Sequence, residues 1–360
     1  MIRIRKGIVM DIIYEDDSIA LAHVCYDGTI HKAVNYNLLS GRINKGDVVY
    51  INTTAGYLHL GTGGYDFIII NESSREIIEI TEPGHIMKLR YTPYQVNCMC
   101  TSEQQSKYHE MIKGFKSLDN MIVISGELHS MLAPAACTLK FLNNDMRIIY
   151  IMTDGGCLEA GFSHTIRELK DKKIISYAVT YGNALGGDAE AVNIFDALAI
   201  AKEVFHGDAA IVTMGPGSVG TGTKYGFSGI EQGSIIDCVN KLNGISVFIP
   251  RISFKDKRKR HFGISHHTIT VLKGVCCTSA HVVFPILEQE YMEYILSQIK
   301  DAELCRYHLI EYIKSDIVFD ALKFYNMNPT TMGRSIKEDK EFFMSCGAAP
   351  VFASYLLNLS

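Results

Sequence analysis

The sequence lacks several features that would place it in a specialised class of protein. It contains no apolar run of the roughly 20 residues that a membrane-spanning helix needs. Its net charge is only −4, so no overall charge draws it to nucleic acid or to an anionic membrane. The basic residues 1–7 are followed by no apolar core and no small-residue cleavage site, so we expect no signal peptide. With 47% hydrophobic and 21% charged residues, the composition is typical of a soluble globular protein.

The sequence also lacks a regular spacing of its ten cysteines, so it does not predict a disulfide framework. The pair Cys98 and Cys100 is the cysteine pattern most similar to a metal-binding motif. Their spacing is too short for a usual zinc knuckle, and no second pair follows. We therefore interpret the cysteines as small core hydrophobes of a protein in the reducing cytoplasm.

Residues 1–92 show the pattern of a small β-barrel domain. Short alternating apolar runs are separated by turn sequences such as Asp27-Gly28. The strands are expected at residues 2–11, 18–26, 29–36, 47–52 and 64–70. Closely spaced strands of this kind favour a barrel. Small barrels often bind oligonucleotides, but stacking aromatics interleaved with basic residues are not evident here, so we do not expect a nucleic-acid partner.

From about residue 120 the pattern becomes that of an α/β domain, which we assign to residues 93–310. Apolar runs alternate with helical patterns, and continuous apolar runs are typical of strands buried on both faces of a parallel sheet. The strands are expected at residues 121–124, 147–152, 174–180, 209–214, 244–249 and 282–284. The repeated strand–helix order predicts a Rossmann-like, mostly parallel fold of the α/β class. Residues 311–360 are expected to form a helical tail that packs on this domain.

Capping residues mark several of the helices between these strands. Ser163 is the expected N-cap of one helix, and Asp188 is the expected N-cap of a longer one. Residues 230–242 place apolar side chains on one side and predict a third helix.

The most informative segment follows the strand expected at 209–214 and is rich in glycine and hydroxyl groups. Glycine lets backbone N–H groups approach a ligand, and consecutive N–H groups before a helix form an anion-binding concavity. This segment therefore predicts a site for a small anionic ligand. The residues assigned to it are Gly215, Gly217, Ser218, Gly220, Thr221, Gly222, Thr223 and Lys224.

The glycine-rich segment partly matches two nucleotide-binding motifs, but it departs from each of them. The spacing Gly215-x-Gly217-x-x-Gly220 fits the dinucleotide fingerprint, but it follows a late strand and does not open a helix directly. A second pattern, Gly217-x4-Gly222-Thr223-Lys224, has the last two residues of a P-loop transposed. We therefore do not expect a nicotinamide or flavin cofactor or P-loop ATPase activity. Tight turns without any ligand remain the structural alternative.

The loops after the other predicted strands are also rich in glycine and in reactive side chains. Because the carboxyl ends of parallel strands meet at one edge of a sheet, we expect Asp154, Gly187, Gly217 and Ser265 to share one cleft. The candidate catalytic residues are His129, Asp154, Asp188, His266 and His267, and the further ligand-binding candidates are Gly187, Arg251 and Ser265. His266 and His267 are expected in a strand, where neighbours point to opposite faces, and His266 is slightly favoured as the one facing the cleft.

These residues leave the kind of chemistry open. A divalent metal could be held by the histidines and aspartates, but no local spacing supports one, and we assign no metal ligand. The candidate nucleophiles Ser130, Ser218 and Ser265 all lack the Gly-x-Ser-x-Gly context. The basic run 255–260 is either a solvated loop or a lid over an anion.

Several longer phrases together resemble those of one protein family. They are Gly61–Tyr65, Pro83–Lys88, Arg90–Pro93, Met152–Gly156, Gly186–Ala191, Gly215–Thr223, Gly226–Gly229, Gly263–His267 and Thr331–Arg334. In combination they resemble the bacterial domain-of-unknown-function family 3866 over nearly the whole chain. The resemblance implies a bacterial, cytoplasmic protein, and it implies no reaction and no catalytic residue.

The residues therefore predict an enzyme of hydrolase or transferase type that acts on a small phosphorylated or carboxylated metabolite. In this hypothesis the glycine-rich segment holds the anion, Arg251 and Lys224 neutralise it, and histidine and aspartate move protons. The alternative is a non-catalytic protein that binds or senses such a metabolite. We expect no membrane partner, and the sequence leaves a homo-oligomer open.

Overall fold

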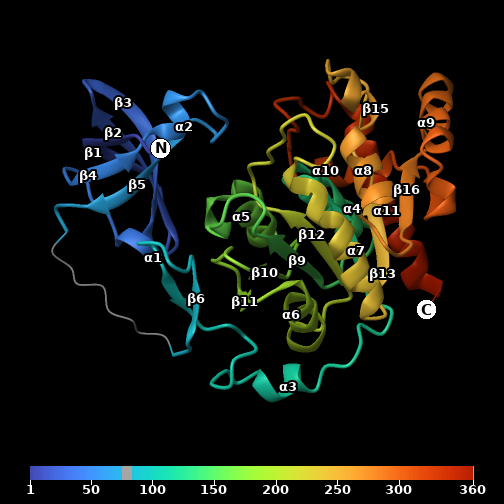
Figure 1. Cartoon of the computed structure of the whole chain (residues 1–360), viewed down its shortest axis with the longest axis horizontal. Helices are drawn as coiled ribbons and strands as arrows, with labels where there is room; N and C mark the ends of the chain where they lie inside the picture. The colour runs from blue at the N-terminus through green and yellow to red at the C-terminus, as the bar shows by residue number, and fades with distance from the viewer. Residues whose placement is uncertain (75–82, 360) are drawn as a thin grey trace. The chain divides into compact units, whose positions relative to one another are not determined.

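The computed structural model describes residues 1–74 and 83–359, which form two compact units, Met1–Met99 and Cys100–Ser360 (Figure 1). Each unit has a hydrophobic core of its own.

The first unit contains a closed five-stranded barrel. Its strands are β1 (Ile4–Glu15), β2 (Ile19–Tyr26), β3 (Thr29–Tyr36), β4 (Val48–Asn52) and β5 (Tyr65–Asn71). They pair in the order β1-β2-β3-β5-β4, and β4 pairs with β1 to close the barrel. All neighbours are antiparallel except β3 and β5. The expected small barrel is confirmed, because alternating residues such as Val24, Ala33 and Ile51 fill its interior.

Short elements complete this unit and lead into the second one. They are α1 (Asn37–Ser40), α2 (Thr54–Tyr57), the paired strands β6 (Ile86–Lys88) and β7 (Val96–Cys98), and α3 (His109–Lys113).

The second unit is built on an eight-stranded sheet in which every neighbouring pair is parallel. The strands are β8 (Ile122–Gly126), β9 (Ile148–Thr153), β10 (Tyr177–Tyr181), β11 (Ala189–Ala191), β12 (Ala209–Met214), β13 (Ile245–Ile249), β16 (His281–Pro285) and β17 (Leu309–Ile313). Their order is β11-β10-β9-β12-β8-β13-β16-β17. The predicted parallel α/β fold is therefore confirmed.

Helices cover both faces of this sheet (Figure 1). They are α4 (Leu132–Leu142), α5 (His164–Asp171), α6 (Ile194–Ala199), α7 (Gln232–Lys241), α8 (His266–Gly274), α9 (Gln289–Asp301), α10 (Ile317–Phe324) and α11 (Lys340–Leu359). One core joins α4, α10 and α11 to one face, and a second joins α6 and α7 to the other. No helix in the described ranges is long and apolar enough to cross a membrane.

Two expectations about local structure are wrong. Asp188 does not cap a helix, because it comes just before β11, and α6 is capped instead by Asn193, whose side chain accepts from the N–H of Asp196. The tail expected to be helical from residue 311 begins within β17, before α10 and α11. By contrast, Ser163 caps α5 as predicted, since its side chain accepts from the N–H of Ile166.

The strand order creates a topological switch point at the centre of the sheet. After β8 the chain crosses to β9 on one side, whereas after β13 it moves to β16 on the other side. Because β8 and β13 are neighbours, their outgoing connections diverge and leave a crevice at their carboxyl ends. A ligand site is expected there.

Candidate functional site

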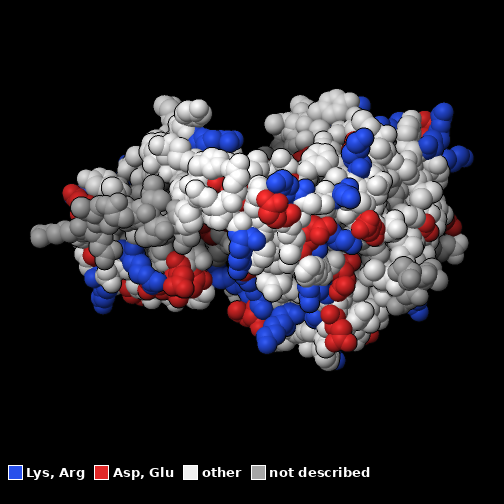
Figure 2. All heavy atoms as spheres, turned by 90° about the horizontal axis from the view of Figure 1, so that it is seen from below, with Lys and Arg blue, Asp and Glu red and all other residues white. Residues whose placement is uncertain are grey.

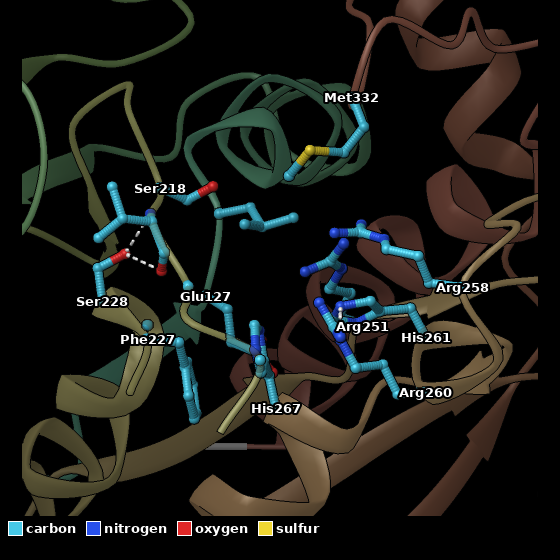
Figure 3. Close-up of a pocket in the computed structure, with 15 residues that line it drawn as sticks. Glu127, Ser218, Phe227, Ser228, Arg251, Arg258, Arg260, His261, His267 and Met332 are labelled. Atoms are coloured by element: carbon cyan, nitrogen blue, oxygen red, sulfur yellow. Dashed lines mark hydrogen bonds between the residues drawn. The ribbon is translucent and has the colours of Figure 1, made fainter. Parts of the chain in front are cut away.

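A cavity of about 240 Å³ lies at this edge of the sheet, and we call it the edge cavity. Its polar side chains are those of Glu127, Ser218, Ser228, Arg251, Arg258, Arg260, His261 and His267. Figure 3 shows the arginines and His261 on one side, Ser218, Ser228 and Phe227 on the other, and Glu127 and His267 between them. The segments that meet here follow β8, β12 and β13.

One wall is the 215–229 loop, which folds back on itself after β12. Val219 and Ser228 exchange hydrogen bonds, and the N–H of Thr221 donates to the carbonyl of Gly226 at 2.8 Å. Alternate residues of such an extended pair point their N–H groups away from the partner. Ser218, Gly220 and Gly222 are these alternate residues, and their N–H groups make no hydrogen bond to the part of the chain that the structure describes.

Two glycines of this loop allow the wall to approach the opposite side. Gly222 has a φ of +82°, and a Cβ atom there would lie 3.3 Å from Nη1 of Arg260. A Cβ atom on Gly220 would lie 3.5 Å from Cε1 of His267. Both glycines line the edge cavity, so side chains at these positions would occupy it.

The opposite wall carries three arginines, of which two lie near one carboxylate, that of Asp256. Asp256 accepts from Nε and Nη2 of Arg258 at 3.0 and 2.7 Å, and it lies 3.7 Å from Nη2 of the buried Arg251. Hydrogen bonds from Arg258 hold the pKa of Asp256 well below its usual range. Arg260 makes no ion pair with a carboxylate in the described ranges. The wall therefore carries a net positive charge that suits an anion.

Glu127 follows β8 and is the acidic group of the edge cavity. The hydroxyl of Thr268 donates to its Oε1, and its Oε2 has no hydrogen-bond partner among the described residues. Burial raises the pKa of Glu127 to about 7, and the nearby Arg251 opposes this shift only partly. A carboxyl group with this pKa changes its protonation state near neutrality.

Three histidines cluster beside the arginines. His261 ends a short 3₁₀ turn (Lys259–His261), and His266 and His267 begin α8, where Ser265 is the N-cap. The expectation that His266 and His267 lie in a strand is therefore wrong, because the capping serine starts a helix. His267 lines the edge cavity, whereas His266 is not among its lining residues. Burial lowers the pKa of His261 and of His267 to about 3 and also lowers that of His266.

The structure brings together only part of the predicted site. Of the predicted residues, those that line the edge cavity are Ser218, Gly220, Gly222, Arg251 and His267. The predicted residues outside its lining are His129, Asp154, Gly187, Asp188, Gly215, Gly217, Thr221, Thr223, Lys224, Ser265 and His266. Ser265 nevertheless contacts the site, because its Oγ lies 2.8 Å from Nδ1 of His261.

Several of the residues outside the cavity hold the scaffold together. Asp188 accepts from the N–H of Ala178 at 2.7 Å and pairs with Lys170. Nδ1 of His129 donates to the carbonyl of Met214, and its Nε2 lies 2.7 Å from Oγ of Ser163. Both ring nitrogens of His129 are thus engaged in joining β12 to the start of α5.

Three further predicted residues make contacts with local structure. Gly187 packs closely on β10, since a Cβ atom there would lie 2.8 Å from Oγ1 of Thr180. Asp154 accepts from the N–H of Asn183 at 3.0 Å. Lys224 lies over the ring of Tyr225, with Nζ 4.9 Å from the ring centroid.

Sequence reasoning missed five polar residues of the cavity: Glu127, Ser228, Arg258, Arg260 and His261. Glu127 had a usable signal, because it lies in the loop that follows the strand predicted at residues 121–124. The basic run 255–260 was noticed, but its residues could not be assigned individually. Their direction depends on the pair β14 (Ile252–Ser253) and β15 (Gly263–Ile264), which are too short for a periodic pattern.

Comparison with known proteins gives a match to one family profile. The profile described as "Protein of unknown function (DUF3866)" covers residues 32–350. No curated protein and no solved structure matches the chain.

Proposed function

The chain belongs to this family of unknown function, and from the edge cavity we propose that it is an enzyme of hydrolase or transferase type acting on a small phosphorylated or carboxylated metabolite. The observation that carries the proposal is the meeting of three arginines, unpaired backbone N–H groups and a buried glutamate in one cavity.

The anion is held from two sides. The guanidinium groups of Arg251, Arg258 and Arg260 supply positive charge. The carboxylate of Asp256 neutralises the charge of one of these groups. The N–H groups of Ser218 and Gly220 supply donors from the opposite wall. Guanidinium groups and backbone N–H groups are the usual partners of phosphate and carboxylate oxygens. The volume of about 240 Å³ suits a small metabolite better than a dinucleotide.

Glu127 is the proposed proton carrier, in place of the histidines favoured by the sequence. Its pKa of about 7 lets it accept and return a proton near neutral pH. His261 and His267, with pKa values of about 3, are weak bases. In the proposed reaction ionised Glu127 takes a proton from the attacking water or hydroxyl while the oxygen of that nucleophile bonds to the transferred group. The bond from the transferred group to the leaving oxygen breaks, Glu127 returns the proton to that oxygen, and the arginines offset the charge on the transferred group.

Nucleic acid is a poorer candidate ligand. Basic and acidic side chains are interspersed on the face of the second unit drawn in Figure 2, and the net charge is −4. A nucleic-acid surface usually gathers its basic residues in a stripe. The proposal also includes a cytoplasmic setting, which the irregular cysteine spacing supports.

Anion binding is tested by calorimetric titration of the full chain with inorganic phosphate and with malonate. Arg260→Gln should weaken binding by about 10- to 100-fold, the value of one or two hydrogen bonds to a charged group. Lys224→Gln is the matched control, because Lys224 is a cation outside the cavity lining, and it should bind as the unaltered protein does. Equal affinities for all three proteins would overturn the anion site.

Catalysis is tested on a panel of phosphomonoesters and carboxylic esters, with product release as the readout. Glu127→Gln should reduce turnover by about 100-fold or more and leave phosphate affinity within a few-fold. A non-catalytic sensor is the second candidate, favoured by the same arginine wall. Phosphate binding with no turnover on any substrate by the unaltered protein would support the sensor and contradict the enzyme.

A further inference from the structure

We infer that His261, His266 and His267 form a binding site for a divalent transition metal such as Zn²⁺, with an open coordination position toward the edge cavity. We call these residues the three-histidine cluster. The inference deepens the proposed function and rests on it for the identity of the anion that would complete the site. Metal binding itself is measurable separately.

The geometry of the cluster is close to that of a metal site. One nitrogen from each of the three rings lies within 4.8 Å of the others. With metal–nitrogen distances of about 2.0–2.1 Å, a tetrahedral site places its nitrogens roughly 3.3 Å apart. Rotation about the broad χ2 torsion of histidine provides adjustments of this kind.

The hydrogen bond between His261 and Ser265 orients His261 as a ligand, because Nδ1 lies 2.8 Å from Oγ of Ser265 and can donate its proton there. Nε2 then keeps its lone pair, toward which Nε of Arg260 donates at 3.3 Å. A metal ion on Nε2 would replace this contact with Arg260. A partner on the second nitrogen that fixes the tautomer is typical of metal-bound histidine.

His266 supplies an independent sign of a missing partner. Its Nε2 is buried and makes no hydrogen bond to any described residue. Buried polar atoms nearly always have partners, and each one left unpaired costs about 1–3 kcal/mol. A metal ion at the three-histidine cluster would provide this partner.

The ligand set indicates which metals fit. Three neutral imidazoles favour Zn²⁺ and similar transition metals, whereas Mg²⁺ and Ca²⁺ prefer oxygen ligands. Three protein ligands leave one coordination position open, as in catalytic rather than structural zinc sites. His261 and His267 line the edge cavity, so this position is accessible to its ligand.

The neighbouring charges predict that metal and anion bind together. Arg251, Arg258 and Arg260 line the same cavity as His261 and His267, and their positive charge disfavours a bare cation there. An anion bound in the edge cavity offsets the positive charge of the arginines and so favours a cation at the three-histidine cluster. Coupling between two ligands is reciprocal, so phosphate should strengthen Zn²⁺ binding, and Zn²⁺ should strengthen phosphate binding by the same factor.

The experiment uses the full chain, freed of metal with a chelator and titrated with Zn²⁺ alone and with Zn²⁺ in inorganic phosphate. One ion per chain should bind, and phosphate should tighten binding by about 5- to 150-fold. Co²⁺ in the same site should give the visible absorption of a four-coordinate ion. The absence of stoichiometric Zn²⁺ binding overturns the inference.

The variants His261→Gln, His266→Gln and His267→Gln assign the ligands. Each should lower Zn²⁺ affinity by about 100-fold or more, since even indirect partners are worth 10- to 100-fold. His164→Ala is the control, because that side chain is 81% exposed and lies outside the cluster. Unchanged affinity in all three variants, or an equal loss in the control, contradicts the assignment. Phosphate binding without Zn²⁺ binding supports the proposed function and contradicts this inference. Zn²⁺ binding without any anion affinity supports this inference and contradicts the proposed function.

Discussion

The imidazole of His267 lies face to face on the ring of Phe227, with centroids 3.8 Å apart and planes 4° from parallel. Phe227 is buried and is bridged to Gly220 within the 215–229 loop. The 215–229 loop therefore sets the plane of a histidine on another element, and this contact joins the loop to the three-histidine cluster.

Phe227→Leu should loosen this histidine without unfolding the protein. Losing part of a buried ring costs about 1–2 kcal/mol of unfolding free energy, and Zn²⁺ affinity should fall because His267 loses its platform. Phe205→Leu is the matched control, since Phe205 stacks on Tyr177 at 4.1 Å far from these residues in the fold. Urea unfolding and Zn²⁺ titration check both variants. An affinity unchanged in Phe227→Leu would show that the stacking does not orient His267.

Thr268→Val should shift the pH dependence of turnover. The hydroxyl of Thr268 donates to Glu127 and accepts from the N–H of Arg251 at 3.0 Å. The bond to Glu127 lowers the pKa of that carboxyl, so its loss should move the rising limb of the pH profile to higher pH. The unpaired groups should also cost about 1–3 kcal/mol of stability. Thr270→Val, in the same helix, should leave the profile in place, and a shift in both variants would refute the specific role of Thr268.

Glu127→Gln should make stability less dependent on pH. Burial raises the pKa of folded Glu127 from 4.5 to about 7, so its favourable contribution is complete below about pH 4.5 and is lost as the pH rises through 7. Above pH 8 the unaltered protein should lose roughly 3 kcal/mol relative to the variant, compared with their difference at pH 4.5. Urea unfolding at both pH values measures this. Glu231, whose pKa burial also raises to about 7, titrates in both proteins and cancels. Parallel stability curves would contradict the elevated pKa.

Gly220→Val should abolish phosphate binding, whereas Gly217→Ala should only lower stability. Gly220 lines the edge cavity beside His267, so added methyl groups occupy the space of the anion. Gly217 has a φ of +110° but is not among the lining residues, and alanine there carries a strain of about 1 kcal/mol. Calorimetric titration separates the two effects. A Gly217→Ala protein that no longer binds phosphate would return the site to the position expected from the sequence.

Asp188→Asn should destabilise the protein without weakening phosphate binding. Asp188 accepts from Lys170 and from the N–H of Ala178, contacts that hold the start of β11 on β10. The amide keeps one acceptor but loses the charge, so a loss of about 1 kcal/mol is expected for this partly exposed pair. Thermal unfolding and phosphate titration check this. A large loss of phosphate affinity would restore the catalytic role expected for Asp188.

The sequence allowed the scaffold to be predicted better than the site. Residues 29–36 and 209–214 were predicted with the bounds that β3 and β12 have, because turn residues flank clear apolar patterns. The three-residue β11 gives no such pattern. Ser265, a favoured N-cap residue, marks the start of α8, but His266 and His267 were expected in a strand.

The site was harder to predict because its members come from distant segments. Glu127 and Thr268 are joined across 141 positions. Arg260 lies in the connection between the paired strands β14 and β15, and this pairing brings it close to Gly222 of the 215–229 loop. Local periodicity does not predict contacts between residues so far apart in the sequence. These contacts follow from the order of the strands in the sheet.

That order also affects how the protein is made. β8 is the first strand of the sheet to leave the ribosome, yet both of its neighbours, β12 and β13, are synthesised roughly 90 and 120 residues later. The nascent chain therefore carries an apolar strand with both edges open while almost a third of the second unit is translated. Such long-range parallel pairing is slow to form and exposes surface on which chaperones act. Chains that terminate before β13 should accumulate as aggregates rather than as smaller folded proteins.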